Sequence, residues 1–177
     1  MTVSYLADVA VELLDAATDA LVQATTGHAP PSEAWVSHAA PVSDYCCDGG
    51  QVTVHLASLD HEPFGTFNTE PPSQNCASTP TARYVITVRR CYPSLDTTGK
   101  APTPSAMDDA SAMLLADLWA ILTELYDRRA AGTLFSAPTL CADVEIGVAE
   151  PEEPQGGCAG WTVPVAVVCN DSGPTGS

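Results

Sequence analysis

The stretch "AMDDASAMLLADLWAILTELYDRRA", residues 106–130, carries the clearest structural signal in the sequence. Its apolar residues recur at helical spacing. Asp108 and Asp109 stand near its start and Arg128 and Arg129 near its end, which are the placements that a helix dipole favours. The pattern predicts one long helix, with a capping box that begins at Ser105 and with Gly132 as its stop.

This helix is expected to have one apolar and one acidic face. The acidic face is predicted to carry Asp117, Glu124 and Asp127. The broad apolar face, which should pack on the rest of the protein, comprises Leu114, Leu115, Leu118, Trp119, Ile121, Leu122, Leu125 and Tyr126.

The remaining periodic segments define the expected fold class. Residues 3–24 predict a first helix, with apolar residues on one side and Asp8, Glu12, Asp15 and Asp19 on the other. Residues 49–58, 83–91, 139–150 and 161–169 show the alternation of strands, and Pro164 suggests that the last of them is an edge strand or bulged. The order α-β-β-α-β-β predicts an α+β fold: a small, mostly antiparallel four-stranded sheet with two helices packed on one face.

The 177 residues suit a single domain, 1–177. Residues 28–45 read as irregular, with Trp35 as an anchor. Residues 58–82 hold four prolines and many polar residues, so a long loop is expected there, and the tail from about residue 171 is expected to be disordered.

The charge balance excludes some functions. Acidic residues number 22 against 6 basic ones, a net charge of −16. Such a surface repels phosphate backbones and anionic membranes, because both are bound mainly through Lys and Arg. We therefore expect neither tight DNA binding nor a membrane partner. The first apolar stretch carries four acids and no basic region precedes it, so no signal peptide is expected either.

The seven cysteines favour a structural role over a chemical one. No C-x-x-C pair occurs, and adjacent cysteines cannot easily ligate one metal ion, so we expect no metal site. No helix start follows Cys158 that would activate its thiol, so no catalytic cysteine is expected. Cys141 and Cys169 read as small strand residues. The others stand in turns or at strand ends, where a disulfide or a buried thiol would staple loops, and which of them pair stays open: Cys46, Cys47, Cys76, Cys91 and Cys158.

Neighbouring carboxylates such as Glu152 and Glu153 are expected in solvated turns or on the exposed faces of helices and strands, so we predict no catalytic residues. Phosphate-loop and dinucleotide-binding motifs are missing from the sequence, and no cofactor is expected. Arg89 and Arg90 stand out in an acidic chain. They either pair across strands with acids such as Glu145, or contact an acidic neighbouring subunit.

Taken in series, four features resemble a known group of proteins. They are "CCDGGQVTV" (46–54), "ARYVITVRRCYPSLDTTGKAP" (82–102), the Asp-rich amphipathic helix, and "EPQGGCAGWTVPV" (153–165). This series, over roughly residues 5–169, resembles tail-terminator and head-to-tail connector proteins of long-tailed phages that infect actinobacteria. The Ala- and Thr-rich composition with almost no lysine fits a GC-rich genome of that kind.

The resemblance implies a virion structural protein and not an enzyme. It implies a tail terminator at the neck, a homo-oligomeric and typically hexameric ring that caps the tail tube and joins it to the head. Its partners would be its own copies, the major tail protein and the head-side neck proteins. DNA would pass through the lumen without tight binding, and the protein would be found in the virion and, during assembly, in the host cytoplasm.

Three alternatives are kept. One is another neck component, a connector or a stopper; neck adaptors are usually mostly helical and stoppers small β-barrels, so the terminator is preferred. Another is an acidic DNA mimic that inhibits a nuclease or repressor, which would need carboxylates arrayed over an extended face. The last is a small thiol or zinc enzyme.

Overall fold

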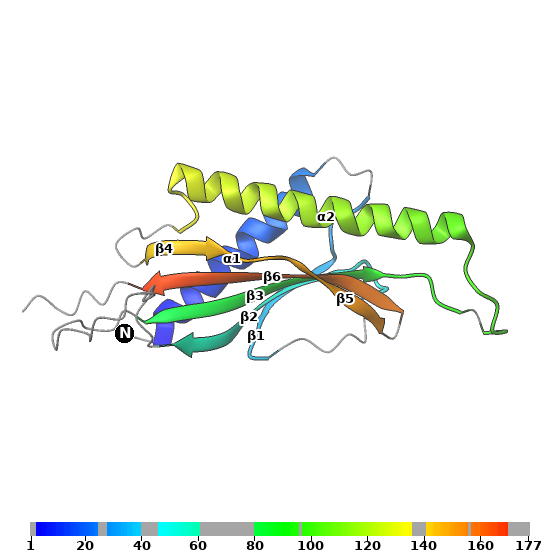
Figure 1. Ribbon diagram of the computed structural model, residues 1–177, viewed down its shortest axis with the longest axis horizontal. Helices are drawn as coiled ribbons and strands as arrows, with labels where there is room; N and C mark the ends of the chain where they lie inside the picture. Colours follow the sequence, from blue (N-terminus) through cyan, green and yellow to red (C-terminus); the bar gives the residue numbers. More distant parts are fainter. Residues whose placement is uncertain are drawn as a thin grey trace, which may run out of the picture.

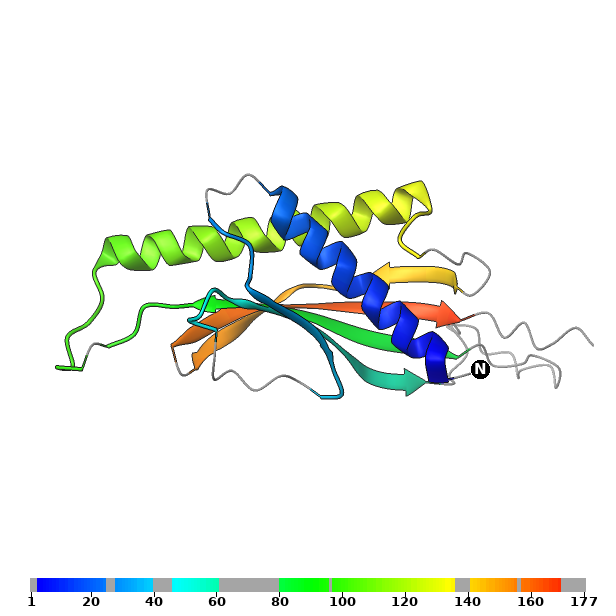
Figure 2. The ribbon, with the colours of Figure 1, turned by 180° about the vertical axis from the view of Figure 1, so that it is seen from behind.

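The structure is a computed structural model, and it describes residues 3–24, 28–39, 46–60, 80–95, 97–135, 141–155 and 157–169. Within these ranges, six strands form one sheet, and two helices pack against it (Figures 1 and 2). In chain order the elements are α1 (Val3–Gln23), β1 (Glu33–Ser37), β2 (Gln51–Asp60), β3 (Thr81–Cys91), α2 (Pro104–Ala131), β4 (Cys141–Ile146), β5 (Glu150–Gln155) and β6 (Cys158–Cys169).

The sheet differs from the one that the sequence predicts. Its strand order is β1-β2-β3-β6-β4, with β5 also bonded to β6. It is mixed, because β1 pairs with β2 in parallel while the other pairs are antiparallel. The expected four-stranded, mostly antiparallel sheet in the order α-β-β-α-β-β is therefore wrong. The chain runs α-β-β-β-α-β-β-β, and the strands that the prediction lacked are β1 and β5.

Both missed strands have exposed side chains. β1 lies in the segment that was expected to be irregular, and its Trp35 is only half-buried. β5 reads "EPEEPQ" and contains the Glu152-Glu153 pair that was expected in a solvated turn. A strand at the edge of a sheet can be held by backbone hydrogen bonds alone, so neither segment needs the alternating apolar residues that mark a strand in a sequence.

β6 is a central strand and not the expected edge strand. On one side it pairs with β3 over its whole length, with Val85 opposite Pro164. On its other side it pairs with β5 at residues 158–162 and with β4 at residues 165–169. Pro164 lies at the change from one partner to the other, where Gly147 N donates to Pro164 O at 2.8 Å. A proline fits a central strand here because its neighbour across the second edge is a link between strands.

Both helices lie on the same face of the sheet, as alternate residues of β3 show. Tyr84 Oη donates to Leu6 O of α1 at 3.0 Å, and Arg90 bonds to Asp117 of α2. Since these two β3 residues are an even number apart, they point to the same face. α2 runs lengthwise over the sheet, while α1 crosses obliquely (Figures 1 and 2). The core between the layers includes Val9, Leu13, Val52, Val54, Ile86, Val88, Ile121, Leu125, Val163, Val165 and Val167.

The structure corrects three details of α2. Its N-cap is Thr103, whose hydroxyl accepts from Ala106 N, and not the expected Ser105. Gly132 does end the helix, in the left-handed conformation at φ 68°. Asp117, expected on the solvated face, is 1% exposed. The expected apolar face is in fact divided, because part of it faces the core and part of it faces outward: Leu115, Trp119 and Tyr126 are 56%, 74% and 48% exposed.

Residues 61–79, the centre of the expected loop 58–82, lie outside the described residues, as does the expected tail from residue 171. β2 continues to Asp60 and β3 begins at Thr81, so the two ends of the expected loop belong to strands.

Candidate functional site

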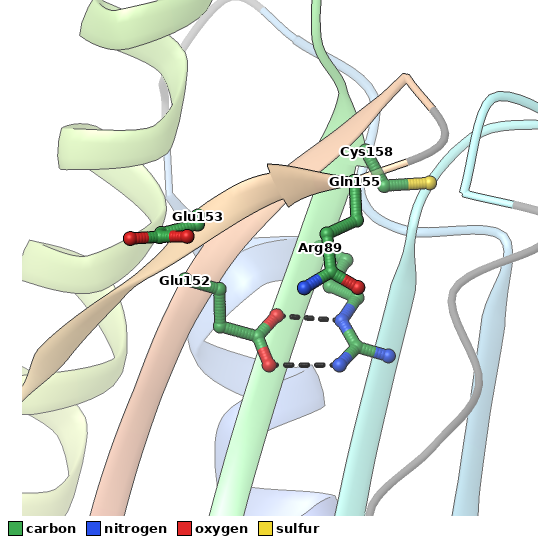
Figure 3. Close-up of a pocket in the computed structure, with 5 residues that line it drawn as sticks. All are labelled: Arg89, Glu152, Glu153, Gln155 and Cys158. Atoms are coloured by element: carbon green, nitrogen blue, oxygen red, sulfur yellow. Dashed lines mark hydrogen bonds and ion pairs between the residues drawn. The ribbon is translucent and has the colours of Figure 1, made fainter.

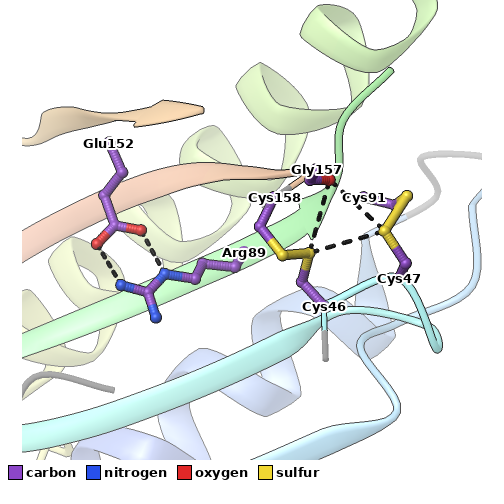
Figure 4. The surroundings of a disulfide bond; sticks show 7 residues. All are labelled: Cys46, Cys47, Arg89, Cys91, Glu152, Gly157 and Cys158. Carbon is purple, nitrogen blue, oxygen red and sulfur yellow. Dashed lines mark hydrogen bonds and ion pairs between the residues drawn. A yellow bond between two sulfur atoms is a disulfide. The ribbon is translucent and has the colours of Figure 1, made fainter. Parts of the chain in front are cut away.

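Four of the five cysteines expected to staple loops lie together at one end of the sheet (Figure 4). Cys46 is joined to Cys158 and Cys47 to Cys91, with Cα–Cα distances of 5.8 and 4.4 Å. Cys91 and Cys158 face each other across β3 and β6. Adjacent residues of the turn 46–49 are therefore bonded to adjacent strands. Cys76 lies outside the described residues.

The arrangement explains why two cysteines stand side by side in the sequence. The turn 46–49 leads directly into β2, and the disulfides fix it to the ends of β3 and β6. They link residues 112 and 44 positions apart. Closing a loop of about 44 residues stabilises the fold by about 4 kcal/mol in the chain-entropy treatment. The chemistry open to this cluster is reversible reduction, in which each disulfide takes up two electrons and two protons.

Arg89 forms a two-pronged ion pair with Glu152 beside the disulfides (Figures 3 and 4). Its Nε and one terminal nitrogen donate to the two carboxylate oxygens at 2.6 and 2.7 Å. The pair spans three strands, because Arg89 and Glu152 are both register partners of Gly160. A Cβ on Gly160 would lie 2.1 Å from Val88 O and 3.0 Å from Arg89 Cγ. Only glycine leaves room for the arginine to pass over β6.

A cavity of about 230 Å³ adjoins this ion pair, and it is lined by Arg89, Glu152, Glu153, Gln155 and Cys158. Figure 3 shows Gln155 beside the arginine and Glu153 turned away from it. Arg89, the cation of this lining, is already paired with Glu152, so the lining resembles a closed structural contact more than a prepared site for an anionic ligand.

Arg90 makes the second ion pair of the cluster, on the helix-covered face. Its guanidinium donates to both oxygens of Asp117, at 2.7 and 3.2 Å, and to the carbonyls of Ala29 and Gly49, at 2.9 and 3.1 Å. The side chains of Arg90 and Asp117 are only 6% and 2% exposed. The pair thus holds α2, β3 and the two segments before β1 and β2 in one arrangement.

Arg89 and Arg90 were expected either to pair with acids of their own chain or to contact a neighbouring subunit. In the structure, both have ion-pair partners within the chain. These are Glu152 and Asp117, not Glu145. Sequence reasoning missed both because their partners lie 63 and 27 positions away. Contact of these arginines with a neighbouring subunit stays a prediction.

The helix-free face of β2 carries buried polar side chains next to Arg89. Gln51 Oε1, Thr53 Oγ1 and His55 Nδ1 have no hydrogen-bond partner in the described part of the chain. Partial burial lowers the pKa of His55 below its ordinary value. The positive charge of Arg89 lowers that pKa further, while Glu152 acts in the opposite sense.

A second surface lies on the outer side of the helices. A groove of about 370 Å³ runs between the end of α1 and the middle of α2, beside the exposed Trp119. Small residues form much of its lining, which comprises Ala20, Gln23, Ala24, Ala116, Trp119, Ala120, Thr123 and Glu124. An exposed tryptophan beside an alanine-lined groove is typical of a protein-contact surface.

In the described ranges, no group of three or more His, Cys, Asp or Glu side chains is placed to hold a metal ion. Nor is either described helix both long and apolar enough to cross a bilayer. No protein-family model matches the chain, and no curated protein matches it.

Proposed function

We propose that the protein is a structural component of a virus particle: a tail terminator that forms a hexameric ring at the neck of a long-tailed phage, caps the tail tube and joins it to the head. Another neck component, a connector or a stopper, is the alternative. The proposal makes the chain an assembly protein whose side chains serve contacts with other proteins and not turnover of a substrate.

The observation that carries the proposal is the exposed apolar surface of α2. Trp119, Leu115 and Tyr126 remain well exposed although the chain has enough apolar residues to fill its core. Large exposed apolar side chains on a strongly acidic protein favour burial against another protein surface.

The charges support a ring that DNA traverses without being held. Each of the five arginines pairs with a carboxylate of its own chain: Arg83, Arg89, Arg90, Arg128 and Arg129. Phosphate binding depends on cations that neutralise the backbone, and here the arginines are engaged by carboxylates of the same chain, in which acidic residues outnumber basic ones 22 to 6. A lumen built from such subunits repels DNA.

The DNA-mimic alternative is weaker. Six carboxylates, Asp19, Asp60, Asp117, Glu124, Asp143 and Glu152, lie within ion-pair distance of arginines. Paired carboxylates contribute less to a phosphate-like array than unpaired ones, and Asp117 is buried altogether.

Two measurements test the proposal. Purified protein mixed with isolated tail tubes should cap tube ends as rings in electron micrographs, and particles assembled without the protein should contain heads and tails that are not joined. Normal, joined particles without the protein would contradict the proposed function. Competition with DNA for a nuclease or repressor, without binding to tubes, would favour the mimic.

A further inference from the structure

The outer face of α2 carries a repeating apolar pattern that its own chain covers only in part, at Leu122. Ala112, Leu115, Trp119, Leu122 and Tyr126 follow one another at alternating spacings of three and four residues. This is the heptad spacing of helices that pair along a seam. Ala112, Leu115, Trp119 and Tyr126 are exposed and Leu122 is half-buried. We call these five residues the α2 seam.

The seam lies opposite the residues by which α2 is anchored in its own chain. Those anchors are Ala110, Leu114, Asp117, Ile121 and Leu125, all buried. A helix with apolar residues on two sides has two surfaces to bury. In the described residues only one of the two is covered, because α1 and the sheet pack against the anchor side.

We propose that a second copy of this chain covers the seam, with the two α2 helices packed side by side and antiparallel about a two-fold axis. This contact between two copies goes beyond the proposed role of the protein in a virus particle. It does not depend on that role.

The groove beside Trp119 supports a second copy as the occupant. It is lined by small side chains, among them Ala20, Ala116 and Ala120, and lies next to the projecting indole. A two-fold contact needs a surface that is complementary to itself, so that a projection on each copy fits a hollow on the other. Trp119 and the groove provide this pair, since each copy can place its indole against the groove of the other.

The charges at the ends of α2 select the antiparallel direction. Asp108 and Asp109 are exposed in the second turn of α2, and Arg129 is exposed in its last turn. In an antiparallel pair, Trp119 of each copy can lie opposite Leu122 of the other, and Leu115 opposite Tyr126. This alignment brings the acidic end of each helix to the basic end of its partner. A parallel pair would place the two acidic ends together and the two basic ends together. Arg129 contacts Asp143 at 3.6 Å, and both side chains are well exposed, so this contact leaves the arginine able to turn to a partner.

A two-fold contact is complete with two copies, so it differs from the head-to-tail contact by which a ring closes. If rings form as well, the α2 contact pairs one ring with another. In either case, loss of the contact halves the mass of the associated species.

The first test compares wild type with Trp119→Glu by analytical ultracentrifugation over a range of concentrations. Wild type should double its mass reversibly, and Trp119→Glu should raise the dissociation constant at least tenfold. The matched control is Val148→Glu, because Val148 is 81% exposed and lies in the link between β4 and β5. This control should associate like wild type. Circular dichroism checks that all three chains fold alike.

The second test exchanges the end charges. Asp109→Arg and Arg129→Asp, each alone, should weaken association about five- to tenfold, since each creates two like-charge contacts in an antiparallel pair. The chain carrying both substitutions should associate like wild type, because every contact is again between opposite charges. Single variants that associate as tightly as wild type would overturn the antiparallel arrangement. A wild type that stays unassociated at every concentration, or a Trp119→Glu chain that doubles normally, would overturn the proposal as a whole. An intact α2 contact in a protein that never enters particles would instead contradict only the proposed function.

Discussion

Arg90 of β3 and Asp117 of α2 form a buried ion pair that joins the sheet to the long helix. Both carboxylate oxygens accept from the guanidinium, and the remaining terminal nitrogen donates to two backbone carbonyls. A charge buried this deeply is tolerated only while its partner and hydrogen bonds are in place. The pair therefore fixes the position of α2 on the sheet and, through it, the direction in which the α2 seam faces.

We expect Asp117→Ala to lower the free energy of unfolding by about 3–5 kcal/mol, because it leaves the Arg90 charge buried without compensation. The matched control is Asp60→Ala, which breaks the exposed pair with Arg83, where the side chains are 39% and 56% exposed. That change should cost at most about 1 kcal/mol. Denaturant unfolding measures both values, and equal losses would mean that the buried pair has no special role.

The same pair shows where sequence reasoning succeeded and where it stopped. Both helices were located to within a few residues, since their periodicity is local. Asp117 lies three residues after Leu114 and four before Ile121, so helical spacing places it on their face of α2, and grouping it with the other acids of the helix overlooked this. Its burial depends on Arg90, which approaches it only after the sheet and the helix have packed.

The strands and the disulfides likewise divide into features with a local sequence pattern, which could be predicted, and features that depend on tertiary pairing, which could not. β2, β3, β4 and most of β6 follow apolar alternation, whereas β1 and β5 are held by backbone pairing that leaves no pattern in their side chains. Cys46, Cys47, Cys91 and Cys158 could be named as staples, but they come together only because the register of β3 with β6 places Cys91 opposite Cys158, which a single sequence does not reveal.

Gly160→Ala should destabilise the protein by several kcal/mol. The added methyl group would overlap Val88 O and crowd the Arg89 side chain on its way to Glu152. Gly132→Ala is the comparison, because a Cβ there meets nothing within 4 Å and only the positive φ of 68° is unfavourable, for about 1 kcal/mol. Thermal unfolding of both variants gives the comparison, and a smaller loss for Gly160→Ala would contradict the close packing of β3 on β6.

Removal of one disulfide by the double change Cys46→Ala and Cys158→Ala should lower the free energy of unfolding by about 2–5 kcal/mol. Of the two disulfides that hold the turn 46–49 to the strands, only Cys47–Cys91 would then be left. A reductant should destabilise wild type at least as much. It should have no effect on the stability of a chain in which the four disulfide-bonded cysteines, Cys46, Cys47, Cys91 and Cys158, are all alanine. If that chain responds to the reductant as wild type does, the stabilisation does not come from these disulfides.

His55 should make stability depend on pH. Its pKa is lowered in the folded chain, first by burial, then by the charge of Arg89, and Glu152 opposes this only in part. The unfolded chain therefore binds the proton more readily, so the stability linked to His55 is present above its ordinary pKa of about 6.5 and declines as the pH falls through and below that value. The acidic surface adds its own pH dependence, which is why the quantity to measure is the difference in free energy of unfolding between wild type and His55→Gln at each pH. We expect this difference to change in favour of the variant as the pH falls from neutral toward 5. A constant difference for His55→Gln across this interval would mean that the imidazole is equally easy to protonate in the folded and unfolded chains.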